Sequence, residues 1–179
     1  MEQDLRVAPP VMVPAQALAS KIFGGIGVRI KWHGRLKDCP ERSILIGLSL
    51  TTSETLEPGA LADAQPSKGT IHVFYDRISR IYSKAQRPVV LGHVLAHEIA
   101  HDLQGFAKHS DHGVMKAQWD QSDLMHMTCK PLAFDDKDVE LIYRGLAQRA
   151  GGALAAAGKD SEAASKVGML SVSSKSAEK

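Results

Sequence analysis

Two histidines four residues apart, His97 and His101, place the strongest constraint on this chain. In an α-helix, residues at positions i and i+4 lie one turn apart on the same face, so both imidazole rings reach one point if the segment is helical. Glu98 stands between them and can lean over the open side of a metal ion bound there. The spacing therefore predicts a helix with a zinc site on one face and a carboxylate placed to act as a general base.

A third ligand must come from elsewhere in the chain, because a tetrahedral catalytic zinc ion takes three protein ligands and one water. The residues that follow offer two histidines, His109 and His112. A carboxylate from a later segment is the remaining alternative. His93 lies one turn before His97 on the same face, but three successive turns cannot all reach one ion. We therefore expect His93 to be a buried partner and not a ligand.

A glycine, a His-Ser pair and a methionine follow the two histidines in the order Gly105, His109-Ser110, Met115. This series resembles the extended zinc signature of the metzincin metallopeptidases, in its matrixin-type form. In that family a glycine ends the active-site helix, a third histidine completes the zinc site, and a methionine in a tight turn lies beneath the metal. The resemblance implies that His109 is the third ligand in preference to His112, and that Met115 supports the site without binding the metal.

The spacing of the third ligand departs from the family pattern. The family places its glycine three residues, and its third histidine six residues, after the second histidine, whereas here Gly105 and His109 follow His101 by four and eight. The loop is thus two residues longer, which a flexible turn absorbs at small entropic cost. The segments Phe74-Tyr75-Asp76-Arg77 and Val89-Val90-Leu91-Gly92, together with Trp119, extend the resemblance. With them the chain resembles small bacterial zinc metallopeptidases over roughly residues 10 to 150.

The resemblance implies a zinc-dependent endopeptidase with one catalytic ion and a peptide or protein substrate. Glu98 would take a proton from the zinc-bound water and later pass it to the leaving amine. By analogy with the family, an extended substrate would lie along a sheet edge, for which our candidate is the strand Ile71–Tyr75, directly before the active-site helix. Tyr75 and His126 are the candidates for a second oxyanion donor.

Two other classes of protein remain open. The first is a zinc hydrolase outside the metzincins, with a later carboxylate such as Glu140 as third ligand; the series from Gly105 through His109 to Met115 argues against it. The second is a non-catalytic binding domain stabilised by zinc. Glu98 argues against that class, because a structural zinc site is usually closed by four ligands and has no need of an adjacent base.

Composition and charge limit the partners. A chain of 179 residues with 44% hydrophobic and 23% charged residues can bury one core, so we expect a single globular domain. The net charge of +2, without a cluster of Lys, Arg and aromatic residues, gives no attraction to nucleic acid. No apolar run is long enough to span a membrane. We therefore expect no nucleic-acid partner, no membrane span and a monomer.

The redox state and the compartment are left open by the sequence. No basic stretch followed by an apolar core opens the chain, so no signal peptide is visible, whereas the resemblance implies a secreted or otherwise exported protein. Cys39 and Cys129 allow either one disulfide or two free thiols.

Hydrophobic periodicity predicts an α/β (α+β) fold, a twisted mixed sheet with a buried active-site helix and a C-terminal helix. The expected elements are a helix opening at Pro14 and ended by Gly24-Gly25, strands at 28–32, 44–50 and 70–75, a loop at 51–68, the zinc-site helix at 88–104, and a last helix capped by Asp135. We place the peptidase domain at residues 1–150. Residues 151–179, rich in Ala, Ser and Lys, are predicted to be a disordered tail.

Overall fold

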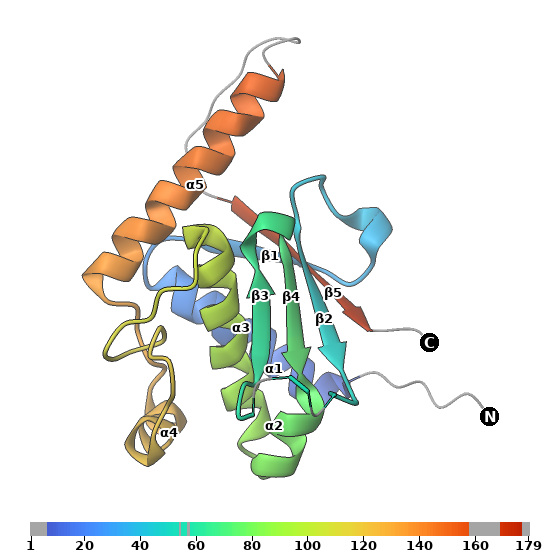
Figure 1. The fold of residues 1–179 in the computed structure, drawn as a ribbon, viewed down its shortest axis with the longest axis vertical. Helices are drawn as coiled ribbons and strands as arrows, with labels where there is room; N and C mark the ends of the chain where they lie inside the picture. Colours follow the sequence, from blue (N-terminus) through green and yellow to red (C-terminus); the bar gives the residue numbers. More distant parts are fainter. Residues whose placement is uncertain (1–6, 54, 57, 158–168, 177–179) are drawn as a thin grey trace, which may run out of the picture.

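One five-stranded sheet organises the molecule in the computed structural model, which describes residues 7–53, 55–56, 58–157 and 169–176 (Figure 1). The strand order is β1-β5-β2-β4-β3; all strands run parallel except β3, which pairs antiparallel with β4. The strands are β1 (Arg29–His33), β2 (Ile44–Ser49), β3 (Ala62–Gln65), β4 (Thr70–Phe74) and β5 (Met169–Ser176). The mixed sheet with helices agrees with the predicted fold class.

Helices cover one face of this sheet. The two that lie behind it in Figure 1 are α1 (Pro9–Gly24) and α3 (Arg87–Gln104). The inward side chains of the strands meet them: Ile44 and Ile46 of β2 and Ile71 and Val73 of β4 are fully buried. Each alternates with a more exposed residue, as a strand with one covered face requires. The remaining helices are α2 (Tyr75–Ile81), α4 (Gln121–Cys129) and α5 (Asp136–Ala157), with two short 3-10 turns, η1 (Leu36–Asp38) and η2 (Pro66–Lys68).

Helix α3 is buried along almost its whole length because two glycines let neighbouring helices approach its backbone. A Cβ added at Gly92 would lie 2.8 Å from Cδ2 of Leu18 on α1. A Cβ added at Gly145 of α5 would lie 1.6 Å from the carbonyl oxygen of Leu103. Only a residue without a side chain fits at either contact. Helix α3 is therefore fixed from two sides, by α1 and by α5.

Helix α1 begins at Pro9, five residues before the predicted start at Pro14. The two prolines of its first turn cost little, since the N–H groups that they lack would be unpaired there in any case. Pro14 is inside the helix and exposed. It lacks only the N–H that would have reached the carbonyl of Pro10, which is exposed to water. The prediction that Pro14 opens the helix was therefore wrong, because the helix tolerates this proline in its interior.

The predicted edge strand at Ile71–Tyr75 was also wrong. Strand β4 lies between β2 and β3, and Tyr75 is already the first residue of α2. The edge strand next to β4 is β3, which lies within the segment 51–68 that was predicted to be loop. The sequence of β3, Ala-Asp-Ala-Gln, carries none of the branched or aromatic residues that mark strands, so its pairing with β4 was not visible in the pattern.

The predicted disordered tail was wrong for the residues that the structure describes within it. Helix α5 continues to Ala157, in keeping with the high helix propensity of alanine. Residues 169–176 form β5, inserted between β1 and β2, with Val172 paired to both Trp32 and Ile44. A strand rich in serine is held there by backbone hydrogen bonds to two neighbours, which composition does not reveal. Residues 158–168 and 177–179 lie outside the described part.

Across the described residues, no helix combines the length and the apolar character needed to cross a membrane.

Replacing Gly145 by alanine should lower the free energy of unfolding by about 3 kcal/mol, because the new methyl group collides with the Leu103 backbone. Gly151→Ala is the matched control in the same helix, since nothing lies within 4 Å of the added carbon. It should raise stability by up to about 1 kcal/mol through helix propensity. Urea unfolding followed by circular dichroism measures both. Equal midpoints for the two variants would contradict the packing of α5 on α3.

Candidate metal centre

The helix with the two histidines ends where the sequence predicted. Gly105 adopts the left-handed conformation, with φ of 81°, and its N–H bonds to the carbonyl of His101. A residue with a side chain is strained in this conformation, so glycine is suited to reversing the chain here. The segment that follows turns back along α3. It brings His109 against the histidine pair.

Three imidazole nitrogens converge at one point. Nε2 of His101 lies 2.9 Å from Nε2 of His97 and 3.2 Å from Nε2 of His109. Nitrogens bound tetrahedrally to one ion at about 2.0–2.1 Å lie about 3.3 Å apart, close to these separations. Nε2 of His101 carries at most one proton, which it can donate to His97 or to His109 but not to both. Without a metal ion, it would therefore face the lone pair of one neighbouring ring without a hydrogen bond. The residues present thus fit one bound metal ion.

Burial keeps the two helical histidines neutral. Burial and the neighbouring His109 lower the pKa of His97 to about 4, against the opposing effect of its hydrogen bond to Val114. Burial, followed by the charges of His97 and His109, lowers the pKa of His101 to about 3. A histidine binds metal through the lone pair of its neutral form. Both rings are therefore in the ligand form at neutral pH.

A hydrogen bond from Nδ1 of His97 to the carbonyl of Val114, 2.8 Å long, fixes the orientation of the first ring. A carbonyl only accepts, so Nδ1 carries the proton and Nε2 keeps its lone pair for a metal. Val114 is itself held by its N–H, which donates to Ala133. Gly113, with φ of 75°, leaves room for that approach, since a Cβ there would lie 2.3 Å from the Ala133 oxygen.

The exposed third histidine is anchored through its neighbour, Ser110. The backbone N–H of Ser110 donates to the carbonyl of Met115 at 2.8 Å, and its hydroxyl donates to Asp138 at 2.8 Å. Met115 is fully buried, and Asp138 lies in the first turn of α5. The turn with the methionine and the start of α5 thus position His109. The predicted cap of α5 is confirmed, because Asp135 accepts from the N–H of Asp138 at 2.7 Å.

Glu98 is the buried carboxylate next to the first histidine, with 8% of its surface exposed. Burial, and then the charge of Asp63 on β3, raise the pKa of Glu98 to about 8. A cation held by the three histidines would act in the opposite direction and favour the carboxylate. Without a bound cation, burial therefore favours the protonated form of Glu98 at neutral pH.

Two other histidines lie outside this cluster. His112 is exposed and is not part of the group formed by His97, His101 and His109. His93 is fully buried, with Nδ1 bonded to the carbonyl of Val89 at 2.8 Å and Nε2 accepting from the N–H of Leu132 at 3.1 Å. Its role as a buried partner agrees with the prediction.

Of the other predicted residues, none that the structure describes joins the histidines. Tyr75 packs against the core at the start of α2, and His126 is exposed on α4. Glu140 is exposed and paired with Arg144 along α5. Cys39 and Cys129 are both free thiols.

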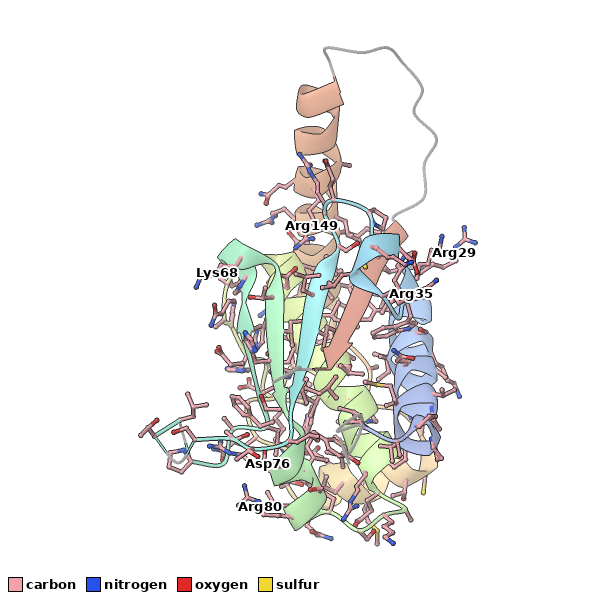
Figure 2. The ribbon with its side chains drawn as sticks, turned by 90° about the vertical axis from the view of Figure 1, so that its right-hand side faces the viewer. Arg29, Arg35, Lys68, Asp76, Arg80 and Arg149 are labelled. Atoms are coloured by element: carbon pink, nitrogen blue, oxygen red, sulfur yellow. The ribbon has the colours of Figure 1, made fainter. Side chains whose placement is uncertain are left out.

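Two residues contribute to the site in roles that the sequence analysis did not assign. The ring of Trp119 packs edge-on against His97, with centroids 5.8 Å apart, and its Nε1 donates to the carbonyl of Gly113 at 3.3 Å. Asp102, buried directly after the second histidine, pairs with Arg149. Arg149 is labelled on α5 in Figure 2. An acidic residue within a helix this apolar was a signal for a buried ion pair. Its partner, far along the chain, carried no such signal.

Comparisons of the chain with known protein families, with curated proteins and with solved structures found no match. The geometry of the site is therefore the basis for inferring what it binds.

Replacing His109 by alanine should weaken binding of a divalent transition metal by orders of magnitude, because two nitrogens hold such an ion poorly. His112→Ala removes an exposed histidine three residues away and is the matched control, for which we expect unchanged affinity. Competition with a chelating dye measures both. If His112→Ala empties the site while His109→Ala does not, the ligand set is wrong.

The tryptophan beside His97 should report binding. Co²⁺, a quencher of indole fluorescence at short range, should reduce the emission of Trp119 because its ring contacts a ligand ring. The chain has two tryptophans, and the other, Trp32 on β1, donates a hydrogen bond to Ser20 on α1. Trp119→Phe should therefore abolish the saturable quenching and Trp32→Phe should retain it. The opposite pattern would place the metal elsewhere.

Proposed function

We propose that this protein is a zinc-dependent endopeptidase, in which His97, His101 and His109 hold one zinc ion and Glu98 is the general base. The observation that carries the proposal is the convergence of three histidine nitrogens, two of them from the helix that also carries the buried carboxylate of Glu98. Three ligands leave a fourth tetrahedral position open, which is the arrangement of catalytic sites and not of structural ones. The likeness of the sequence signature to that of the metzincins supports the same proposal.

The roles of the residues follow from this arrangement. A bound zinc ion would lower the pKa of a water molecule to about 7 and polarise the scissile carbonyl. Glu98 would accept the proton of that water and donate it to the leaving amine. Burial raises the pKa of Glu98, whereas a bound cation would lower it and so favour the carboxylate form, which accepts the proton of the water.

The edge strand β3 is the surface along which an extended substrate would lie. It packs against α3, and its Asp63 is close enough to influence the pKa of Glu98. One side of β3 bonds to β4, and its other side is the edge of the sheet. A peptide that added to this edge through backbone hydrogen bonds would pass beside the metal centre. The opposite edge, β1, is separated from β3 by the other three strands of the sheet.

The two alternatives have less support. A third carboxylate ligand from Glu140 requires that exposed residue to leave its pair with Arg144 and enter a cluster that already has three nitrogens. A non-catalytic binding domain gives no reason for burying the carboxylate of Glu98, whose desolvation is costly.

Replacing Glu98 by glutamine tests the proposal. The variant keeps the size and polarity of the side chain but cannot accept a proton, so cleavage of a peptide library or of casein by the zinc-loaded protein should fall by about a hundredfold or more. Zinc content should stay at one ion per chain. Glu140→Gln, which changes an exposed glutamate on α5, is the control and should retain full activity.

Cleavage by Glu98→Gln at the rate of the unchanged protein would remove this residue from the mechanism. A zinc-loaded wild-type protein that cleaves no peptide in the library would favour the binding domain instead.

A further inference from the structure

The two edges of the sheet differ in how they are protected against pairing with another strand. Edge β1 carries Arg29 and Lys31, both exposed. Charged side chains of this kind, above all lysine, are a common device that prevents an edge strand from pairing. Edge β3 has no lysine, arginine or proline; its four residues are Ala, Asp, Ala and Gln. The sheet is thus protected at β1 and open to a further strand at β3 (Figure 1).

The backbone of β3 presents hydrogen-bonding groups on its outer side. The N–H of Phe74 donates to the carbonyl of Leu61 at 2.8 Å, which continues the register of β3 with β4. Bonded pairs alternate along an antiparallel ladder, so Asp63 bonds to β4 while the backbone groups of Ala62 and Ala64 point away from it. No strand among the described residues pairs with them there. An added strand would therefore bond to Ala62 and Ala64.

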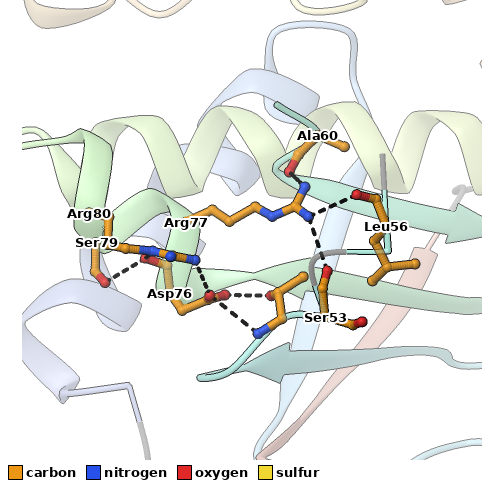
Figure 3. A network of polar contacts seen from close by, with 8 residues as sticks. Ser53, Leu56, Ala60, Asp76, Arg77, Ser79 and Arg80 are labelled. Carbon is orange, nitrogen blue, oxygen red and sulfur yellow. Dashed lines mark hydrogen bonds and ion pairs between the residues drawn. The ribbon is translucent and has the colours of Figure 1, made fainter. Parts of the chain in front are cut away.

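Both ends of β3 are held in place by the protein itself. Nη1 of Arg77, on α2, donates to the carbonyl of Ala60 at 2.7 Å, directly before β3 (Figure 3). Helix α2 follows β4, so this bond ties the beginning of β3 to its neighbouring strand. At the other end, η2 packs against α3. A peptide would thus meet a preformed edge and avoid the cost of ordering it.

Asp63 is the one charged residue of β3, and its side chain is exposed. Its pairing partner on β4 is His72, which is also exposed and alternates with the buried Ile71 and Val73. Gln65 donates to Oδ2 of Asp63 at 3.3 Å. Among the described residues, no cationic side chain lies within ion-pair distance of Asp63. Its carboxylate therefore has no counter-charge in this part of the chain.

This carboxylate lies near the metal centre. Strand β3 packs against α3, the helix with His97 and His101. After burial, the charge of Asp63 is the next cause that raises the pKa of Glu98, so the two side chains are near enough to interact. A strand added to β3 would pass beside both.

We propose that β3 binds an extended peptide with a lysine or arginine directly opposite Asp63. This rests on the proposed function, whose substrate class it narrows to basic segments. In an antiparallel peptide, the residue opposite Asp63 belongs to the pair type without hydrogen bonds, in which Cα atoms lie about 4.5 Å apart and side chains are closest. An opposite charge at that position is favourable, and a like charge is unfavourable. The next peptide residues, bonded to Ala62 and Ala64, would turn their side chains to the face covered by α3.

The test measures peptide binding without cleavage. Zinc-loaded, full-length Glu98→Gln protein is titrated into fluorescein-labelled peptides of alanine and threonine, in which one position at a time carries Lys, Gln or Glu. Fluorescence anisotropy gives the affinities, at low salt because salt screens an exposed ion pair. At one position, Lys should bind about threefold more tightly than Gln, and Glu should bind more weakly than Gln.

Two variants made in the same protein test the role of Asp63. Asp63→Asn should remove the difference between Lys and Glu at that position, and Asp63→Lys should reverse it, because the sign of the charge sets the preference. The matched control is Asp136→Asn, which removes the same charge from an exposed position in the first turn of α5 and should keep the preference.

Three results would overturn the proposal: equal affinities for the Lys and Glu peptides, no binding of any peptide, and a preference that survives Asp63→Asn. The proposed function fails separately. If the zinc-loaded wild-type protein binds the Lys peptide with this preference and does not cleave it, the peptidase is wrong while the role of Asp63 is upheld.

Discussion

The hydrogen bond between His97 and the carbonyl of Val114 joins the two parts of the chain that make the metal centre. On one side is α3, fixed by its glycine contacts with α1 and α5. On the other is the turn before Lys116, which is tied to Ala133 and, through Ser110, to α5. Because the ring, the turn and the third histidine share this chain of contacts, the site is positioned by backbone groups as much as by its ligands.

Burial shifts the pKa values of the histidines and of Glu98 in opposite directions. The same burial lowers the pKa of His97 and His101 and raises that of Glu98, so the protein by itself favours neutral rings and a protonated acid. A divalent cation would supply positive charge and bring the carboxylate back to its ionised form. Because the three histidines meet only in the folded chain, binding of a metal ion there would also stabilise the fold.

The sequence predicted the parts that depend on local pattern. The spacing of His97 and His101, the glycine after α3 and the cap at Asp135 each follow from helix geometry, and all three are present. The choice of His109 over His112 as third ligand depended on the resemblance to the metzincin signature. Residue spacing could not decide it, because both histidines lie in a loop, which has no regular periodicity. Strand β3 and the carbonyl of Val114 could not be found, since backbone pairing partners carry no side-chain signal.

The position of β5 has a consequence for how the protein is made. Strands β1 and β2 meet only through β5, whose residues are synthesised well over a hundred positions after them. Pairing over such a separation is slow, because a long stretch of chain must be confined before any contact forms. Until β5 is synthesised, the edges of β1 and β2 that it will pair with have no strand beside them. Such edges are sites for association with other chains, so the order of synthesis leaves the emerging protein open to aggregation until β5 is in place.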